Sequence, residues 1–123
     1  MSSPIGFVGL GIMGEGMAAR LVTQGVATAD CPLIVWNRTP TKSTDLQSKF
    51  PDVVQIKDTA REVVAACAVT YSMLSTPEAS RAVFEGDDGV LAGVTEGKSI
   101  VDCATLAEAD MQRMSEAVLA KGG

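Results

Sequence analysis

The chain has 123 residues, of which 46% are hydrophobic and 20% are charged, and its formal net charge at pH 7 is −5. A chain of this length and hydrophobicity can bury enough surface to fold as one domain, which excludes intrinsic disorder. The acidic balance argues against general binding to nucleic acid or to an anionic membrane, so any phosphate recognition has to be local. No apolar run approaches the ~20 residues of a membrane span.

The three cysteines, Cys31, Cys67 and Cys103, are far apart in a chain that has no histidine. Their spacing is not that of a zinc site, so we expect no metal centre. We expect reduced thiols that serve mostly as small core residues.

Residues 1–4 lead directly into an apolar run without room for a signal peptide, which predicts a cytoplasmic protein.

The first predicted turn carries a motif for phosphate binding. An apolar run ends at Gly9, and Gly9, Gly11 and Gly14 have G-x-G-x-x-G spacing before an amphipathic stretch. In a dinucleotide-binding unit, the first glycine permits the turn, the second lets a pyrophosphate approach the backbone, and the third lets the helix pack closely. The phosphates lie at the positive end of that helix. The flanking strand and helix favour this interpretation over a plain glycine-rich turn.

The rest of the chain alternates predicted strands and helices. Apolar runs and their flanking turns predict strands at 5–9, 33–36, 53–56, 68–74 and 99–103. The predicted helices begin after Gly14 and fade at 24–25, then follow at 40–49, 59–66 and 75–84, with one helical turn at 90–93 and a last helix from 105 to before Gly122.

Capping residues indicate where several helices begin. Thr39 and Pro40 are typical of an N-cap and a first helical residue. Three further starts have a Ser or Thr three positions before an acidic residue, as in a capping box. These pairs are Thr59 with Glu62, Ser75 with Glu78, and Thr105 with Glu108.

Five strands alternating with helices predict an α/β fold, a Rossmann-type doubly wound parallel sheet in a single domain over residues 1–123. In such a sheet, ligands bind beyond the carboxyl ends of the strands, where the strand order reverses. We therefore expect four segments to meet at one crevice: 9–14, 37–39, 73–75 and 102–105.

The residues after the second predicted strand favour one cofactor. An NAD-binding unit usually carries Asp or Glu there, about 20 residues beyond the glycines, to hold the adenosine ribose. This chain has Asn37 followed by Arg38. Because no carboxylate repels a 2′-phosphate and a guanidinium can bind it, NADP(H) is the better fit. Thr39 is expected to cap its helix and still offer a hydroxyl. Lys42 follows one turn on, and for both cations the alternative is an ordinary solvated side chain.

Four motifs in this order, at 9–14, 36–39, 73–75 and 101–105, resemble the NADP-binding domain of the β-hydroxyacid dehydrogenases. That family includes 3-hydroxyisobutyrate dehydrogenase, tartronate semialdehyde reductase and 6-phosphogluconate dehydrogenase, and the chain is most similar to its glyoxylate and succinic semialdehyde reductase branch. The resemblance covers essentially the whole chain. It implies hydride transfer between NADP(H) and a small hydroxy acid or semialdehyde.

The resemblance also implies that Leu74 and Ser75 line the nicotinamide side of the cofactor and that Thr105 contacts it. With the residues identified above, the predicted cofactor-binding set is Gly9, Leu10, Gly11, Ile12, Met13, Gly14, Asn37, Arg38, Thr39, Lys42, Met73, Leu74, Ser75 and Thr105.

Two features depart from that family. Ala104 stands where relatives carry a serine that helps hold the substrate carboxylate, and a methyl group cannot donate that hydrogen bond. The family's helical domain, which brings the catalytic lysine and most of the dimer interface, is absent from these 123 residues. Because hydride transfer to a carbonyl needs a positioned proton donor, we expect cofactor binding without turnover, and we assign no catalytic residue.

Three other polar residues have ordinary structural interpretations. Tyr71 is expected in the core, and Cys103 is expected to be a small buried thiol. For Asp102, ordering a neighbouring loop and being an ordinary helix-end or solvated carboxylate are equal alternatives.

Two functions remain open. In the first, the chain is the cofactor domain of an NADP-dependent dehydrogenase, which forms homo-oligomers in relatives. It predicts poor solution behaviour and an exposed apolar patch along the last helix. We favour it because the sequence ends near the boundary before the family's substrate loop. In the second, it is a stand-alone, non-catalytic NADPH-binding or sensing module. FAD binding is a weaker alternative, because FAD-binding units normally carry an acidic residue where this chain has Asn37.

The sequence of the last predicted helix is relevant to both of these possible functions. Its apolar stripe is Ala107, Met111, Met114 and Val118. The polar residues that would suit a stand-alone module are Gln112, Arg113, Ser115 and Glu116.

Overall fold

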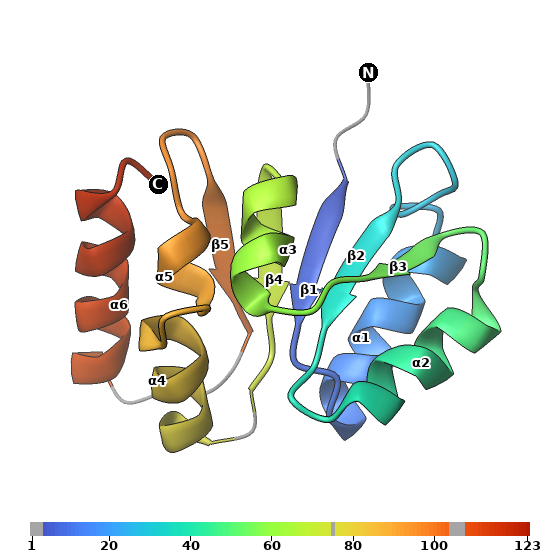
Figure 1. Cartoon of the computed structure of the whole chain (residues 1–123), viewed down its shortest axis with the longest axis horizontal. Coiled ribbons are helices and arrows are strands. Elements are labelled where there is room, and N and C mark those ends of the chain that lie inside the picture. The colour runs from blue at the N-terminus through green and yellow to red at the C-terminus, as the bar shows by residue number, and fades with distance from the viewer. Residues whose placement is uncertain (1–3, 75, 104–107) are drawn as a thin grey trace.

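Figure 1 shows a computed structural model of the chain, which describes residues 4–74, 76–103 and 108–123. A parallel sheet runs through its centre in the order β3-β2-β1-β4-β5. The strands are β1 (Ile5–Val8), β2 (Leu33–Trp36), β3 (Val54–Ile56), β4 (Val69–Ser72) and β5 (Ser99–Asp102). The helices are α1 (Ile12–Thr23), α2 (Pro40–Lys49), α3 (Ala60–Ala66), α4 (Pro77–Glu85), α5 (Val90–Gly93) and α6 (Glu108–Ala120).

This architecture confirms the predicted doubly wound α/β fold. β1 is central, pairing with β2 on one side and β4 on the other, so the strand order reverses between β1 and β4. The predicted strand 33–36 matches β2, and the other four predicted strands extend one or two residues beyond the observed ends, as at Val53 and Cys103. The difference is small because the hydrogen bonds between β4 and β5 continue past the end of β5: Cys103 N donates to Ser72 O at 2.8 Å.

Alternate strand residues pack on opposite faces of the sheet. On one face, Phe7 and Val35 pack with Leu46 of α2 and with the buried side of α1. On the other, Val8 and Ile34 pack with residues of α3, α4, α5 and α6. The apolar run of β2 is therefore buried on both faces, as its sequence predicts.

The helix starts confirm part of the capping analysis and correct the rest. Thr59 Oγ1 accepts a hydrogen bond from Glu62 N at 3.1 Å, as expected. In α4 the N-cap is Thr76 and not Ser75, because Pro77 takes the first helical position, which suits its fixed φ. Thr39 is the N-cap of α2 and Pro40 begins the helix, as predicted, but the expected capping hydrogen bond from the Thr39 side chain is not made. The predicted cap at Thr105 lies outside the described residues.

Candidate functional site

A cleft of about 520 Å³ opens beyond the carboxyl ends of β1, β2 and β4. It lies at the point where the strand order reverses, which is where open parallel sheets bind ligands. Segments that follow these three strands line it, together with two residues of α4. The lining residues are Gly9, Gly11, Met13, Gly14, Asn37, Arg38, Thr39, Lys42, Met73, Leu74, Ala79 and Val83.

Most residues of the predicted cofactor-binding set therefore meet in this cleft. Leu10 does not line it: its side chain is fully buried. Ile12 begins α1 and so belongs to the same turn. Ser75 and Thr105 lie outside the described residues, so their predicted contacts stay predictions.

Two lining residues, Ala79 and Val83, were missed by the sequence analysis. Both are small apolar residues of α4, which in a sequence look like ordinary core. Their spacing of four places them on one face of a helix that starts directly after a crevice segment. That spacing is the signal that could have found them.

The three motif glycines occupy distinct environments. Gly9 has φ +96°, a conformation that favours glycine, and a Cβ there would collide with the carbonyl oxygen of Met73. A Cβ on Gly14 would collide with the carbonyl oxygen of Gly9, because α1 packs directly against the turn. Gly11 is exposed, and a Cβ on it would meet nothing within 4 Å. The first and third glycines therefore build the turn, while the second borders open space in the cleft.

The N-terminus of α1 faces this space. Gly11 is its N-cap, and the first helical hydrogen bond runs from Glu15 N to Gly11 O at 2.8 Å. The earlier N–H groups of the first turn have no acceptor within the helix and carry the positive end of its dipole. Glu15 sits in the same turn, but its carboxylate pairs with Lys49 of α2 at 3.0 Å, which offsets its negative charge. This turn is thus suited to an anion.

The cleft is positively charged although the chain is acidic. Arg38 is exposed and Lys42 is half-buried, and both lie at the start of α2, next to the glycine turn. Among the described residues that line the cleft, these are the charged ones, and both are cations. The arrangement supplies the local phosphate recognition that a chain of net charge −5 requires.

Tyr71 and the cysteines have mostly structural roles. Tyr71 is half-buried and stacks on Phe7 with ring centroids 6.4 Å apart, as expected for a core residue. Of the three cysteines, Cys67 is buried, whereas Cys31 and Cys103 are only partly so. The expectation of a mostly buried set was therefore wrong, because Cys31 lies in the loop before β2 and Cys103 directly follows β5. Burial and the neighbouring Asp102 raise the pKa of the Cys103 thiol, which disfavours the reactive thiolate.

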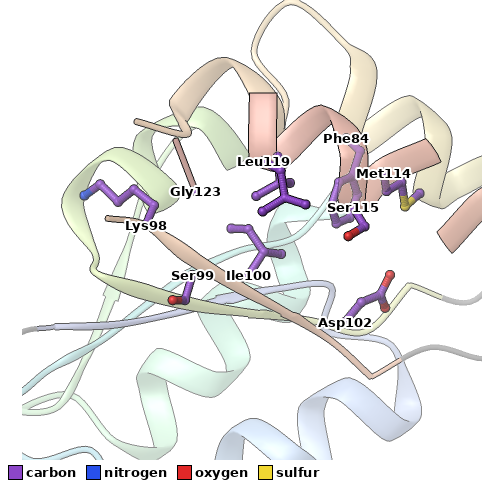
Figure 2. Close-up of a pocket in the computed structure, with 10 residues that line it drawn as sticks. Phe84, Lys98, Ser99, Ile100, Asp102, Met114, Ser115, Leu119 and Gly123 are labelled. Carbon is purple, nitrogen blue, oxygen red and sulfur yellow. The ribbon is translucent and has the colours of Figure 1, made fainter. Parts of the chain in front are cut away.

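A second cavity of about 320 Å³, here called the edge groove, lies between β5 and α6 (Figure 2). Ile100, Met114 and Leu119 give it an apolar wall, and Asp102 lies at one end. Lys98 lies at the other end and donates to two backbone carbonyls near the end of α3, each at 2.9 Å. Because none of its lining residues belongs to the glycine turn or to the start of α2, the edge groove is separate from the cleft.

Two kinds of feature are missing from the part of the chain that the structure describes. No helix there is both long enough and apolar enough to cross a membrane. No group of three or more Cys, Asp or Glu residues within those ranges is placed to hold a metal ion.

The chain was compared with known families and proteins. The family described as the NAD binding domain of 6-phosphogluconate dehydrogenase matches residues 4–123. The zebrafish (Danio rerio) protein named cytokine-like nuclear factor N-PAC is 35% identical over 119 residues, which are 97% of this chain and 24% of that protein. Glyoxylate/succinic semialdehyde reductase 1 of Arabidopsis thaliana is also 35% identical over 119 residues, covering 97% of this chain and 38% of that protein.

A solved structure described as Psf3 in complex with NADP+ and 2-OPP has the same fold. Its TM-score is 0.82 at 26% sequence identity, and the match covers 96% of this chain and 39% of that one. The chain thus spans only about a quarter to two fifths of the length of these relatives.

Proposed function

Because the chain belongs to the family of NAD-binding domains of 6-phosphogluconate dehydrogenase, we propose that its cleft binds NADP(H) in preference to NAD(H) and serves as the cofactor site of a dehydrogenase. One observation carries the preference. Arg38 and Lys42 border the cleft beside the glycine turn, and no carboxylate is among its described lining residues. A 2′-phosphate carries about 1.5 to 2 negative charges near neutral pH, so it is attracted here and would be repelled by an acid at position 37.

The residues present fit such a cofactor. The open side of Gly11 and the first N–H groups of α1 suit the pyrophosphate. Arg38, Lys42 and the hydroxyl of Thr39, which is not used in capping, suit the 2′-phosphate. Met73 and Leu74 give an apolar border after β4, suited to the nicotinamide side. Bound NADP(H) supplies or accepts the hydride, and these residues hold and orient it; Ser75 and Thr105 are proposed as further contacts.

For the whole protein, we propose hydride transfer between NADP(H) and a small hydroxy acid or semialdehyde. The Arabidopsis relative is named as a reductase of glyoxylate and succinic semialdehyde, and Psf3 is described in complex with NADP+. A homo-oligomer and a cytoplasmic location belong to the same proposal. The 123-residue chain itself is expected not to turn over substrate, since the described nicotinamide side of the cleft offers Met73 and Leu74 and no proton donor.

The alternative is a non-catalytic NADPH-binding module, and the outer face of α6 favours it. Gln112 donates to Glu116 at 3.4 Å, and Arg113 pairs with Glu85 of α4 at 3.0 Å. Because these polar side chains are bonded within the chain, this face of α6 does not need a further domain to cover it.

The cofactor proposal is tested by titrating NADPH and NADH separately, by calorimetry, against the chain and an Arg38→Ala variant. The unmodified chain should prefer NADPH. Arg38→Ala should cost about 1.5–3 kcal/mol of NADPH binding, typical of a hydrogen bond to a charged group, and leave NADH binding unchanged. Arg20→Ala is the matched control, because Arg20 is exposed in the last turn of α1, away from the cleft. Equal binding of both cofactors by the unmodified chain would remove the case for a 2′-phosphate site.

The catalytic part of the proposal has a separate assay. The chain is mixed with NADPH and either glyoxylate or succinic semialdehyde, and NADPH absorbance is followed. We expect no consumption, because no described residue can donate the proton at the nicotinamide side. Sustained turnover would show that these 123 residues contain a proton donor that the geometry does not identify.

A further inference from the structure

Asn37 follows β2 and lines the cleft, and each end of its side-chain amide makes a hydrogen bond within the protein. Its Oδ1 accepts a hydrogen bond from Leu10 N at 2.7 Å, and its Nδ2 donates to Thr39 O at 3.1 Å. Leu10 N lies within the glycine turn after β1, and Thr39 is the N-cap of α2. One side chain therefore connects the predicted phosphate-binding turn with the segment that carries Arg38.

From these contacts we infer that Asn37 is a positioning residue for the cofactor site, acting through the two segments that it joins. It holds Arg38 and the Thr39 hydroxyl at a set distance from the glycine turn. The inference rests on the proposed NADP(H) site and adds to it a determinant of cofactor choice. Asn37 then favours NADP(H) by holding Arg38 and Thr39 in place, and not only because it lacks the negative charge of an aspartate.

The two contacts require an amide specifically. A backbone N–H must face an acceptor and a carbonyl must face a donor, so the two bonds together define which end of Asn37 is oxygen and which is nitrogen. Aspartate has the same shape and could accept from Leu10 N. It could not donate to the Thr39 carbonyl, and two acceptors would then face each other. Leucine has nearly the same size and makes neither bond.

The connection matters because the cofactor bridges two sites that are distant in sequence. The pyrophosphate and the 2′-phosphate are joined by one adenosine, so Gly11 and Arg38 must be correctly separated. The chain between them forms α1 and β2 and does not fix that separation locally. Gly9 N donates to Trp36 O at 3.0 Å at the ends of the two strands, and Asn37 extends this link one residue further. A site held in place before binding loses less free energy to ordering.

The first test needs no cofactor. Amide hydrogen exchange of Leu10 is measured in the unmodified chain and in the Asn37→Asp and Asn37→Leu variants. We expect protection of this amide to persist in Asn37→Asp and to fall at least about tenfold in Asn37→Leu. The amide of Gly9, which is bonded to Trp36 O, is the internal control and should stay protected in all three. Unchanged protection of Leu10 in Asn37→Leu would overturn the inference, whether or not NADPH binds.

The second test is a double-mutant cycle on NADPH affinity. Arg38→Ala is made in the unmodified, Asn37→Asp and Asn37→Leu backgrounds. If Asn37 positions Arg38, the substitution should lower affinity about ten- to hundredfold in the unmodified chain and less than about threefold in either variant. A merely structural or directly binding Asn37 would leave the full effect of Arg38→Ala in place, which would overturn the inference. If the unmodified chain shows no preference for NADPH, the proposed function fails, and the Leu10 exchange still decides the contact on its own.

Discussion

Gly11 and Gly14 belong to one motif but should respond differently to the same added methyl group. A Cβ on Gly11 enters open space, whereas a Cβ on Gly14 collides with the carbonyl oxygen of Gly9. We expect Gly11→Ala to change the free energy of unfolding by about 1 kcal/mol or less and to weaken NADPH binding more than tenfold, since the methyl group occupies the pyrophosphate position. Gly14→Ala should destabilise the fold by about 1–3 kcal/mol, as overpacked positions do.

Urea denaturation and NADPH titration of both variants separate these effects. Full NADPH affinity in Gly11→Ala would place the pyrophosphate elsewhere. A Gly14→Ala variant as stable as the unmodified chain would contradict the close packing of α1 on the turn.

At the scale of single residues, spacing and residue type located the cleft but not the bonds within it. The glycine motif and the Asn37-Arg38 pair could be placed because each follows a recognisable apolar strand. The bond between Asn37 and Leu10 joins residues 27 positions apart and depends on the pairing of β1 with β2, which no local pattern specifies. A ribose-binding role and a positioning role for Asn37 therefore look identical in the sequence.

Two threonines at helix N-caps provide a test at the scale of the elements. Thr59 Oγ1 accepts from Glu62 N at 3.1 Å, whereas the Thr39 side chain makes no capping bond. We expect Thr59→Ala to lower the free energy of unfolding by about 0.5–2 kcal/mol and Thr39→Ala to change it by much less. Chemical denaturation of the two variants measures this directly. Equal losses would mean that Thr39 caps α2 in solution and that its hydroxyl is not available to a phosphate.

The elements themselves were more predictable than their ends. Each strand and helix has a distinct hydrophobic pattern, and in β2 the unbroken apolar run indicated burial on both faces. The ends depend on single hydrogen bonds, which is why the capping-box spacing at Ser75 was misleading. The sequence offers two neighbouring hydroxyls, Ser75 and Thr76, and the fixed φ of Pro77 selects the second as the N-cap.

Burial of one thiol should make the stability of the whole molecule depend on alkaline pH. Burial raises the pKa of Cys67 from 9.0 to about 11. Below pH 9 the folded and unfolded chains both keep this proton. Between pH 9 and 11 only the unfolded chain loses it, so the free energy of unfolding should fall as pH rises, by up to about 2–3 kcal/mol. Urea denaturation at pH 8 and pH 10.5 should show a smaller decline for Cys67→Ala; equal declines would contradict this assignment.

The sheet edge at β5 should govern how copies of this chain associate. Ser99 N donates to Ala68 O at 2.8 Å, so in a parallel ladder the next residue, Ile100, directs its backbone groups toward the outer edge of the described sheet. Apolar side chains lie near this edge: Val101 is 40% exposed, and Leu119, which lines the edge groove, is 67% exposed. An edge strand with exposed apolar neighbours is prone to pair with another chain.

Sedimentation at several concentrations tests this with Val101→Lys, since a lysine on an edge strand opposes pairing. We expect the unmodified chain to associate as concentration rises and Val101→Lys to remain monomeric with full NADPH affinity, because the cleft lies beyond other strands. Val26→Lys is the matched control: Val26 is 49% exposed in the loop after α1, so it should leave association unchanged. Association through β5 would favour the cofactor domain of a larger dehydrogenase over a stand-alone module. An unmodified chain that stays monomeric at every concentration would instead favour the stand-alone NADPH-binding module, consistent with the polar face of α6.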